Sequence, residues 1–235
     1  MIVNVDAGEG EAGNAKDLAF LDHVDALNLA LGGHAGDPGW TRELATIAMD
    51  RGLRVHLHPG VPDRASFGRV MPAAMSWPDL ARSLAQQRAV LPGVSCCKFH
   101  GALYNCSTVD RVVAERLVQW SLDEGLEELL VFPGGELEKV AQAAGLRVLR
   151  EAFADRAYCR HDGNKNLVLA QRGVSGAVLD EVESALDQAR NILGRGSVKL
   201  LDGGEAVIAC ETLCLHGDGE VAVELAARLR KEVVG

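Results

Sequence analysis

The sequence contains no uninterrupted apolar stretch that approaches the roughly 18 residues of a membrane-spanning helix. Its first residues, MIVNVDAGEGEAG, have no basic segment followed by an apolar block, so we expect no signal peptide. Disorder is not expected either, because 48% of the 235 residues are hydrophobic. These absences predict a folded cytoplasmic protein that does not bind membranes.

Basic residues are also scarce: 24 Lys and Arg face 33 Asp and Glu, which gives a net charge of −9. A negative surface argues against general binding of nucleic acids or anionic membranes. The phosphate-binding string GxxxxGK(S/T) is absent. The run GEGEAG has the glycine spacing GxGxxG, but neither it nor GGHAGDPG follows the dinucleotide-binding fingerprint in its proper form. The motifs therefore assign no nucleotide site to this chain.

None of the six cysteines forms a CxxC pair. Without a secretion signal, reduced thiols are expected rather than a disulfide framework. Cys96 and Cys97 lie in an apolar run, and we interpret them as small core residues.

Short apolar runs alternate with amphipathic, helix-like segments along the whole chain. We expect strands, apolar on both faces, at 2–5, 26–31, 54–57, 95–99, 128–132, 146–150 and 207–215. A further helix is expected over 176–193, while 152–175 is the least regular segment and a candidate lid or excursion. The pattern predicts one α/β domain over residues 1–235, and seven strands favour a β/α barrel over an open sheet.

Capping residues mark several expected helix starts. Asp37 before a proline is a candidate N-cap, and Ser76 with Asp79 fits the capping-box spacing. Ser107 with Asp110 fits the same spacing, so a helix is expected to start there.

Polar side chains gather where the expected strands end, and four of the seven histidines are among them. The candidates for catalysis are Asp6, His34, His58, Lys98 and His100, and those for substrate binding are Glu9, Asp37, Asn105, Arg156 and His216. Because the carboxyl ends of parallel strands carry the active sites of such folds, this clustering indicates an enzyme. We expect His56 to point away from His58 as a packed structural residue.

Two kinds of chemistry fit this set. Aspartate and histidine from separate strand ends can bind a divalent ion for hydrolysis. The same groups can act as general acids and bases, with Lys98 stabilising negative charge. Since no HExxH motif is present, the presence of a metal stays open at this point.

Six strings in order resemble one known family. They are NVDAGEG (4–10), ALGGHAGDP (30–38), HLHPGVPDRASFGRVM (56–71), CKFHGALYN (97–105), EAFADRAY (151–158) and CLHGD (214–218). They are similar to blocks of the LamB/YcsF family, the A subunit of bacterial ATP-dependent 5-oxoprolinase. The resemblance covers nearly the whole chain.

The resemblance implies a seven-stranded β/α barrel of the glycoside hydrolase/deacetylase type. It also implies ATP-dependent hydrolysis of the lactam 5-oxoproline to glutamate, together with two partner subunits. Asp6, His34, His58 and His100 match motif positions as base, acid and orienting groups, while Lys98 and Arg156 are expected to hold carboxylate or phosphoryl oxygens.

The sequence departs from the family pattern at positions that flank these motifs, namely Leu31, Gly33, Val70 and Phe99. The charged and histidine positions are retained, which favours retained chemistry. Three alternatives stay open: a different lactam or amide substrate, a self-sufficient metal-dependent amidase or deacetylase on the same barrel, and a non-catalytic scaffold or regulatory subunit.

Overall fold

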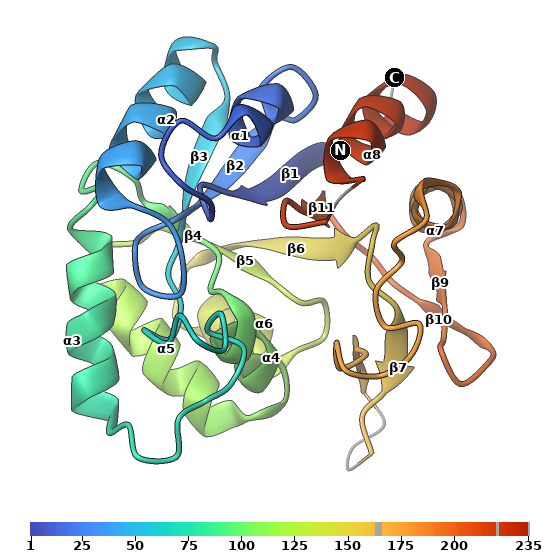
Figure 1. The fold of residues 1–235 in the computed structure, drawn as a ribbon. Helices are drawn as coiled ribbons and strands as arrows, with labels where there is room; N and C mark the ends of the chain where they lie inside the picture. Colours follow the sequence, from blue (N-terminus) through green and yellow to red (C-terminus); the bar gives the residue numbers. More distant parts are fainter. Residues whose placement is uncertain (163–165, 220, 235) are drawn as a thin grey trace.

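The computed structural model describes residues 1–162, 166–219 and 221–234, and its centre is a closed parallel barrel (Figure 1). Around the barrel the strand order is β1-β11-β6-β5-β4-β3-β2, and β2 pairs with β1 to close it. The strands are β1 (Ile2–Ala7), β2 (Ala26–Ala30), β3 (Arg54–His58), β4 (Cys96–Cys97), β5 (Glu128–Val131), β6 (Arg147–Phe153) and β11 (Thr212–His216). The predicted seven-stranded β/α barrel is therefore confirmed.

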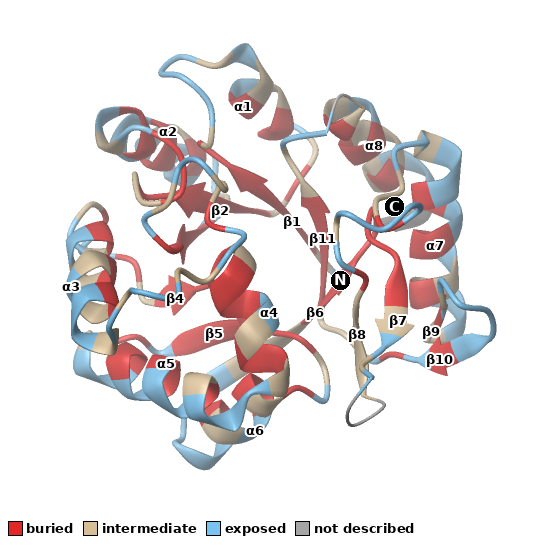
Figure 2. Cartoon of the chain, turned by 60° about the horizontal axis from the view of Figure 1, so that its bottom comes forward, coloured by how far each residue is buried: buried red, intermediate tan, exposed pale blue. Residues whose placement is uncertain are grey.

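Helices surround the barrel and connect its strands (Figure 1). They are α1 (Ala15–Phe20), α2 (Pro38–Asp50), α3 (Trp77–Arg88), α4 (Gly101–Val109), α5 (Arg111–Asp123), α6 (Glu136–Ala143), α7 (Val182–Arg195) and α8 (Ala222–Leu229), which runs into a π-helical segment at Arg230–Val234. Figure 2 shows the buried side of these helices turned towards the strands and the exposed side turned outwards. No helix in the described part of the chain is long and apolar enough to cross a membrane.

The two faces of the strands are buried but chemically different. Outward-facing residues such as Val5 and Leu29 join the hydrophobic core between barrel and helices. Several inward-facing residues are polar: Asn28 donates to Asn4 Oδ1 (2.6 Å), and the Nδ1 atom of His56 lies 2.8 Å from Asn28 Oδ1. The expectation that strands are apolar on both faces is therefore wrong for the inside of the barrel.

His56 is buried, as expected, but it does not point away from His58. Residues two apart on a strand share a face, and both rings contact interior groups: His56 contacts Asn28, and His58 lies 3.5 Å from Asp6. The strand β3 therefore directs two histidines into the barrel at different depths.

Two helix starts agree with the sequence and one does not. The side chains of Asp37 and Ser76 accept backbone N–H groups of α2 and α3, as predicted. Ser107, however, lies inside α4, where its hydroxyl donates to the carbonyl oxygen of Tyr104. Asp110 itself is the N-cap of α5, so the capping-box spacing at 107–110 misplaces this helix start.

The segment between β6 and β11 also differs from expectation. It contains two antiparallel hairpins outside the barrel, β7 (Tyr158–Arg160) with β8 (Leu167–Leu169) and β9 (Ser197–Lys199) with β10 (Glu205–Val207). The expected strand over 207–215 is therefore two elements, and α7 begins six residues later than the expected helix over 176–193. The irregular segment 152–175 includes the β7–β8 hairpin, with 163–165 outside the described residues.

The role of Asp110 as the N-cap of α5 predicts how its substitution changes the stability of the protein. Asp110→Ala removes the acceptor of the Val112 and Val113 N–H groups and should lower the free energy of unfolding by about 1 kcal/mol in urea titrations. Glu115→Ala, which removes an exposed ion pair on the same helix, is the control and should change it by less than about 0.5 kcal/mol. Equal stability of Asp110→Ala and the unchanged chain would contradict this account of α5.

Candidate active site

A buried ion cluster crosses the barrel just below its carboxyl end. Lys98, at the end of β4, donates from Nζ to Asp6 Oδ1 on β1 (2.7 Å) and lies 3.2 Å from Glu151 Oε1 on β6. The same Nζ lies 2.9 Å from Cys214 Sγ on β11. Since β4 is hydrogen-bonded to neither β1, β6 nor β11, these contacts can only be made through the barrel interior.

Charge pairing decides the protonation states in this cluster. Burial alone would raise the pKa of Asp6, but attraction to His58 and Lys98 holds it well below the usual range. Burial opposes the charge of Lys98, yet the neighbouring Asp6 carboxylate raises its pKa well above normal. Burial raises the pKa of Glu151, and Lys98 partly offsets that rise. The pair Asp6–Lys98 is therefore fully ionised at neutral pH.

Three histidines and one glutamate form a second cluster beside Asp6. The rings of His34 and His100 are stacked, with centroids 3.7 Å apart and planes 2° from parallel, and His58 is perpendicular to both. Glu9 Oε1 lies 3.4 Å from His34 Nε2 and 3.7 Å from His100 Nδ1. Each residue offers one ligand atom, and these atoms lie within 4.8 Å of one another, so the cluster could hold a metal ion.

Burial shapes the charge of this Glu9–histidine cluster. It lowers the pKa of His34 and His100 well below normal, and His58 nearby lowers both further. Burial, together with the Asp6 carboxylate, raises the pKa of Glu9 to about 7. Perturbed groups of this kind are typical of functional sites.

Backbone carbonyls fix the orientation of two of these rings. His58 Nδ1 lies 2.8 Å from the carbonyl oxygen of Lys98, and His100 Nε2 lies 2.9 Å from that of Phe67. Phe67 has a φ of 54°, the only positive φ of a non-glycine residue in the described ranges. Gly68 follows it, and a Cβ there would lie 2.6 Å from the Cβ of His34, so the loop can approach the rings only with glycine at this position.

On the other side of Asp6, β11 and the loop after β6 supply an aspartate–histidine pair. The Nδ1 atom of His216 lies 3.0 Å from Asp155 Oδ1, and the His216 backbone N–H donates to Asp155 Oδ2 (2.8 Å). The Nε2 atom of His216 is left facing Asp6 Oδ2, 3.9 Å away. His216 lowers the pKa of Asp155 although burial opposes this, so the carboxylate is ionised and orients the ring.

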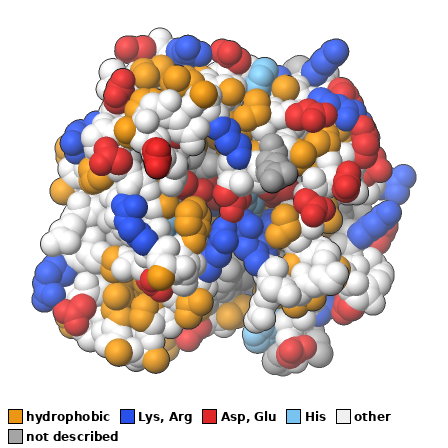
Figure 3. All heavy atoms as spheres, viewed as in Figure 1, with side chains coloured by type: hydrophobic (Ala, Val, Ile, Leu, Met, Phe, Trp, Pro, Cys, Tyr) orange, Lys and Arg blue, Asp and Glu red, His pale blue; other side chains and the backbone are white. Residues whose placement is uncertain are grey.

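A cavity of about 990 Å³ opens above these groups. Its walls include Asp6, His58, Arg69, Lys98, His100, Tyr104, Asn105, Phe153, Arg156, Arg172 and His216. Figure 3 shows basic side chains in the hollow at the centre of this face, although the chain as a whole is acidic.

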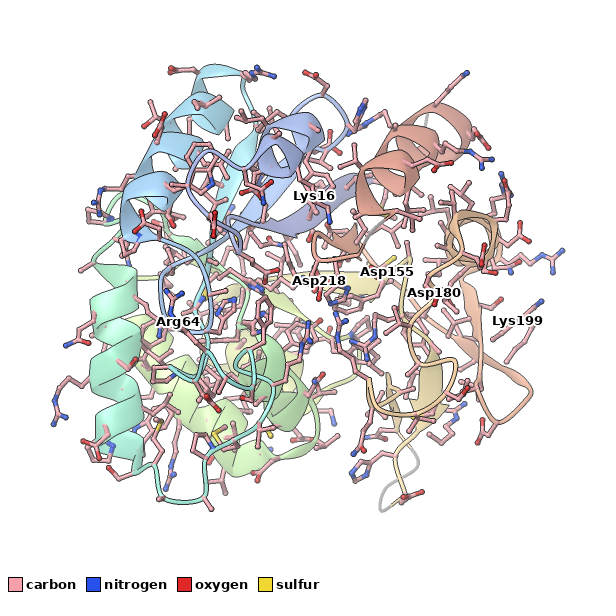
Figure 4. All side chains as sticks on the ribbon, viewed as in Figure 1. Lys16, Arg64, Asp155, Asp180, Lys199 and Asp218 are labelled. Atoms are coloured by element: carbon pink, nitrogen blue, oxygen red, sulfur yellow. The ribbon has the colours of Figure 1, made fainter. Side chains whose placement is uncertain are left out.

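Two arginines at the mouth of the cavity share one carboxylate. Asp218 Oδ2 accepts from Arg69 (2.6 Å) and lies 3.6 Å from Arg172 Nη1. Figure 4 places Asp218 and Asp155 near the centre of the view, over the barrel, and Lys199 at its edge. The two arginines carry two positive charges and Asp218 carries one negative charge. The remaining positive charge at the mouth favours binding of an anionic ligand.

The model of the LamB/YcsF family matches residues 1–235. The chain belongs to the LamB/YcsF family. It is 38% identical to the 5-oxoprolinase A subunit of Nocardia farcinica, over 97% of this chain and 93% of the relative. It is 36% identical to the 5-oxoprolinase A subunit of Methylococcus capsulatus, over 98% and 91%. A crystal structure of the lactam utilization protein from Thermus thermophilus superposes with a TM-score of 0.80 at 34% identity, covering 100% of this chain and 97% of that one.

The structure brings most of the predicted site residues of this LamB/YcsF chain together. Asp6, Glu9, His34, His58, Lys98, His100 and His216 form the connected clusters described above. Asn105 lines the cavity from α4. Asp37 does not line it and instead caps α2. Arg156 lines the wall, but its guanidinium donates to the carbonyl oxygens of Ala170 and Ala177, which ties the loop after β6 to these two residues.

Sequence reasoning overlooks two groups in this LamB/YcsF barrel. Asn28 lies in the middle of an apolar run, but it is in register with Asp6, and its side chain donates to Asn4 and Asp6 because residues two apart on a strand share a face. Arg69 and Arg172 lie in loops far apart in the sequence, and no spacing signal joins them; only the shared Asp218 identifies them.

Substitution of Lys98 should show how much the burial of Asp6 and Glu151 without a cation destabilises the protein. Lys98→Met leaves Asp6 and Glu151 buried without a partner, so the free energy of unfolding should fall by about 3–5 kcal/mol at pH 7. Burial would then raise both carboxyl pKa values above their unfolded values, and stability would be lost as the pH rises above about 4. Urea unfolding between pH 5 and pH 8 measures the deficit, which should grow with pH.

Two variants control this measurement. Lys98→Met/Glu151→Gln should recover part of the loss, since one buried charge is removed. Lys199→Met removes an exposed lysine at the edge of the molecule and should show no pH-dependent deficit. A constant deficit in Lys98→Met from pH 5 to pH 8 would be inconsistent with unpaired carboxylates.

Proposed function

We propose that this chain is the A subunit of a cytoplasmic, ATP-dependent 5-oxoprolinase that hydrolyses the lactam of 5-oxoproline to L-glutamate with two partner subunits. The main support is a cavity with acid–base groups at its floor and two arginines at its mouth, Arg69 and Arg172, which share a single carboxylate. The relatives named as 5-oxoprolinase A subunits, which match over nearly their full length, agree with this assignment.

A five-membered lactam is a stable amide, so its hydrolysis benefits from activation. ATP, used by the assembled complex, would phosphorylate the lactam oxygen. Water then adds to the activated carbon, the ring nitrogen takes up a proton, and the carbon–nitrogen bond breaks. A second water releases inorganic phosphate and leaves the new carboxylate of glutamate. The protein must therefore stabilise negative oxygen atoms and deliver a proton to nitrogen.

The residues of the cavity floor match these two tasks. His216 is held by the ionised Asp155 and presents Nε2 to the cavity, so it is the proposed proton carrier for the ring nitrogen. Lys98 lines the same floor as a permanent cation, and it is the proposed electrostatic partner of the lactam oxygen.

The substrate carboxylate is assigned to the mouth. Arg69 and Arg172 share Asp218, and a bound carboxylate would supply the second negative charge that this pair lacks. This assignment replaces Arg156 as the main anion contact, because its guanidinium is occupied by backbone carbonyls.

Reconstitution tests the proposed function directly. The purified chain alone should not turn over 5-oxoproline, whereas the chain with its partner subunits and ATP should release glutamate, measured by an enzyme-coupled assay. No glutamate from a complex with active partners would exclude the proposal. Release of product without ATP or partners would instead support a self-sufficient amidase.

The anion site makes a second prediction. Arg69→Ala should raise the KM for 5-oxoproline about 10- to 100-fold in the reconstituted complex, because one charge-assisted contact is worth about 1.5–3 kcal/mol. Arg82→Ala, an exposed arginine on α3 that pairs with Asp79, is the matched control and should leave KM unchanged. If both variants had the same KM, the substrate carboxylate would not bind at the mouth.

A further inference from the structure

One ring nitrogen of His58 faces one ring nitrogen of His100, and neither of the two carries a hydrogen atom when the rings are neutral. A carbonyl oxygen only accepts hydrogen bonds, so His58 carries its hydrogen on Nδ1 (to Lys98) and His100 carries its hydrogen on Nε2 (to Phe67). In the neutral rings, His58 Nε2 and His100 Nδ1 are then bare acceptors, and they lie only 2.9 Å apart. This contact is attractive only with a positive ion between the two nitrogens.

The Glu9 carboxylate also lies near this pair of ring nitrogens. Its Oε1 lies 3.7 Å from His100 Nδ1, and among the described residues its ion-pair partners are the rings of His34 and His100 rather than a lysine or arginine. Asp6, by contrast, is already paired with Lys98. A buried carboxylate without a permanent cation is costly, and a metal ion would neutralise it.

The distances fit a small transition-metal ion. Tetrahedral zinc has bonds of about 2.0–2.1 Å, which places neighbouring ligand atoms about 3.3 Å apart. Two of the three separations, 2.9 Å (His58–His100) and 3.7 Å (His100–Glu9), lie on either side of this value. The third is longer, since Glu9 and His58 make no ion pair within 4.0 Å, so the Glu9 side chain must move towards His58 when the ion binds. Two imidazole nitrogens and one carboxylate oxygen form a donor set that such ions prefer.

The surrounding contacts are those of a metal site. Histidine ligands almost always donate their other ring N–H to a carboxylate or a backbone carbonyl, as His58 and His100 both do. The carbonyl that holds His100 belongs to Phe67, whose positive φ is strained for a side chain of this size. Strain of this kind persists where a precise contact is required.

His34 is close enough to be a ligand, but its orientation argues for another role. The lone pair of an imidazole nitrogen lies in the ring plane, and one ion cannot lie in the planes of both rings, which are stacked nearly parallel with their centroids 3.7 Å apart. Since the hydrogen bond to Phe67 frees Nδ1 of His100, His100 is the ligand of the stacked pair. His34 supports its ring and directs Nε2 towards Glu9.

We propose that Glu9 Oε1, His58 Nε2 and His100 Nδ1 bind one divalent transition-metal ion of the zinc class, with His34 as a positioning residue. Three protein ligands leave a coordination position open, and two of them, His58 and His100, line the cavity. Such an ion would supply Lewis acidity beside the Asp6–Lys98 pair. The proposal does not depend on the lactam substrate, because binding of the ion is measured without it.

The test uses the full chain, stripped with a chelator and then titrated with Zn²⁺ by calorimetry and with Co²⁺ by visible absorption. We expect one ion per chain, the intense Co²⁺ bands of a four-coordinate site, and a higher Tm with Zn²⁺. Glu9→Gln and His100→Phe should each weaken binding at least 100-fold. His34→Phe keeps the stacked ring and should weaken it about 10-fold or less, as for other residues that orient ligands.

His23→Ala is the matched control, because His23 lies outside the cluster before β2 and its loss should leave the affinity unchanged. Tm values without metal identify any variant that fails to fold, and the Co²⁺ spectrum of the unchanged chain still decides the proposal. No stoichiometric binding by the unchanged chain, or equal binding by His100→Phe and His23→Ala, would overturn it. Nitrogen NMR spectra that show a shared His58–His100 proton, unaffected by Zn²⁺, would also overturn it.

Discussion

The ammonium group of Lys98, enclosed in the barrel between Asp6 and Glu151, is the interaction on which the rest of the site depends. Buried carboxylates are tolerated only with a partner, and this partner comes from a strand that neighbours neither of them. The pairing therefore requires a closed barrel of this size, with β1, β4 and β6 in the present order. A shift of one residue in any of these strands would turn a charged side chain into the hydrophobic layer beneath the helices.

Asp6 has a special place because β1 is the strand that closes the barrel. It lies in register with Asn28 on β2 and with His216 on β11. Its Oδ1 is held by Lys98 and Asn28, so Oδ2 is left between His58 on one side and His216 on the other, at 3.5 and 3.9 Å. The Glu9–histidine cluster and the His216–Asp155 pair are thus two halves of one site that meet at a single carboxylate.

The sequence predicts the barrel and most of this site because both follow from local patterns. Buried strands, helix caps at Asp37 and Ser76, and polar residues at strand ends are all visible in one pass along the chain. The polar interior is harder to predict because Asn28 and His56 stand among apolar neighbours, and their common face emerges only when the strands are paired. Other features depend on tertiary structure alone: Asp110 becomes the cap of α5 only because α4 already occupies the turn with Ser107.

The two sides of the cavity are held in different ways, and this difference is consistent with different tasks. His58 and His100 are oriented by main-chain carbonyls, one of them from the strained Phe67, so their nitrogens cannot turn without moving the backbone. Arg69 and Arg172 share a partly exposed carboxylate, Asp218, which a ligand carboxylate can replace at little cost, while the Arg69 guanidinium also lies over the Phe67 ring, 4.7 Å from its centroid. The floor of the cavity is therefore preorganised for chemistry, whereas the mouth can exchange partners as ligands enter and leave.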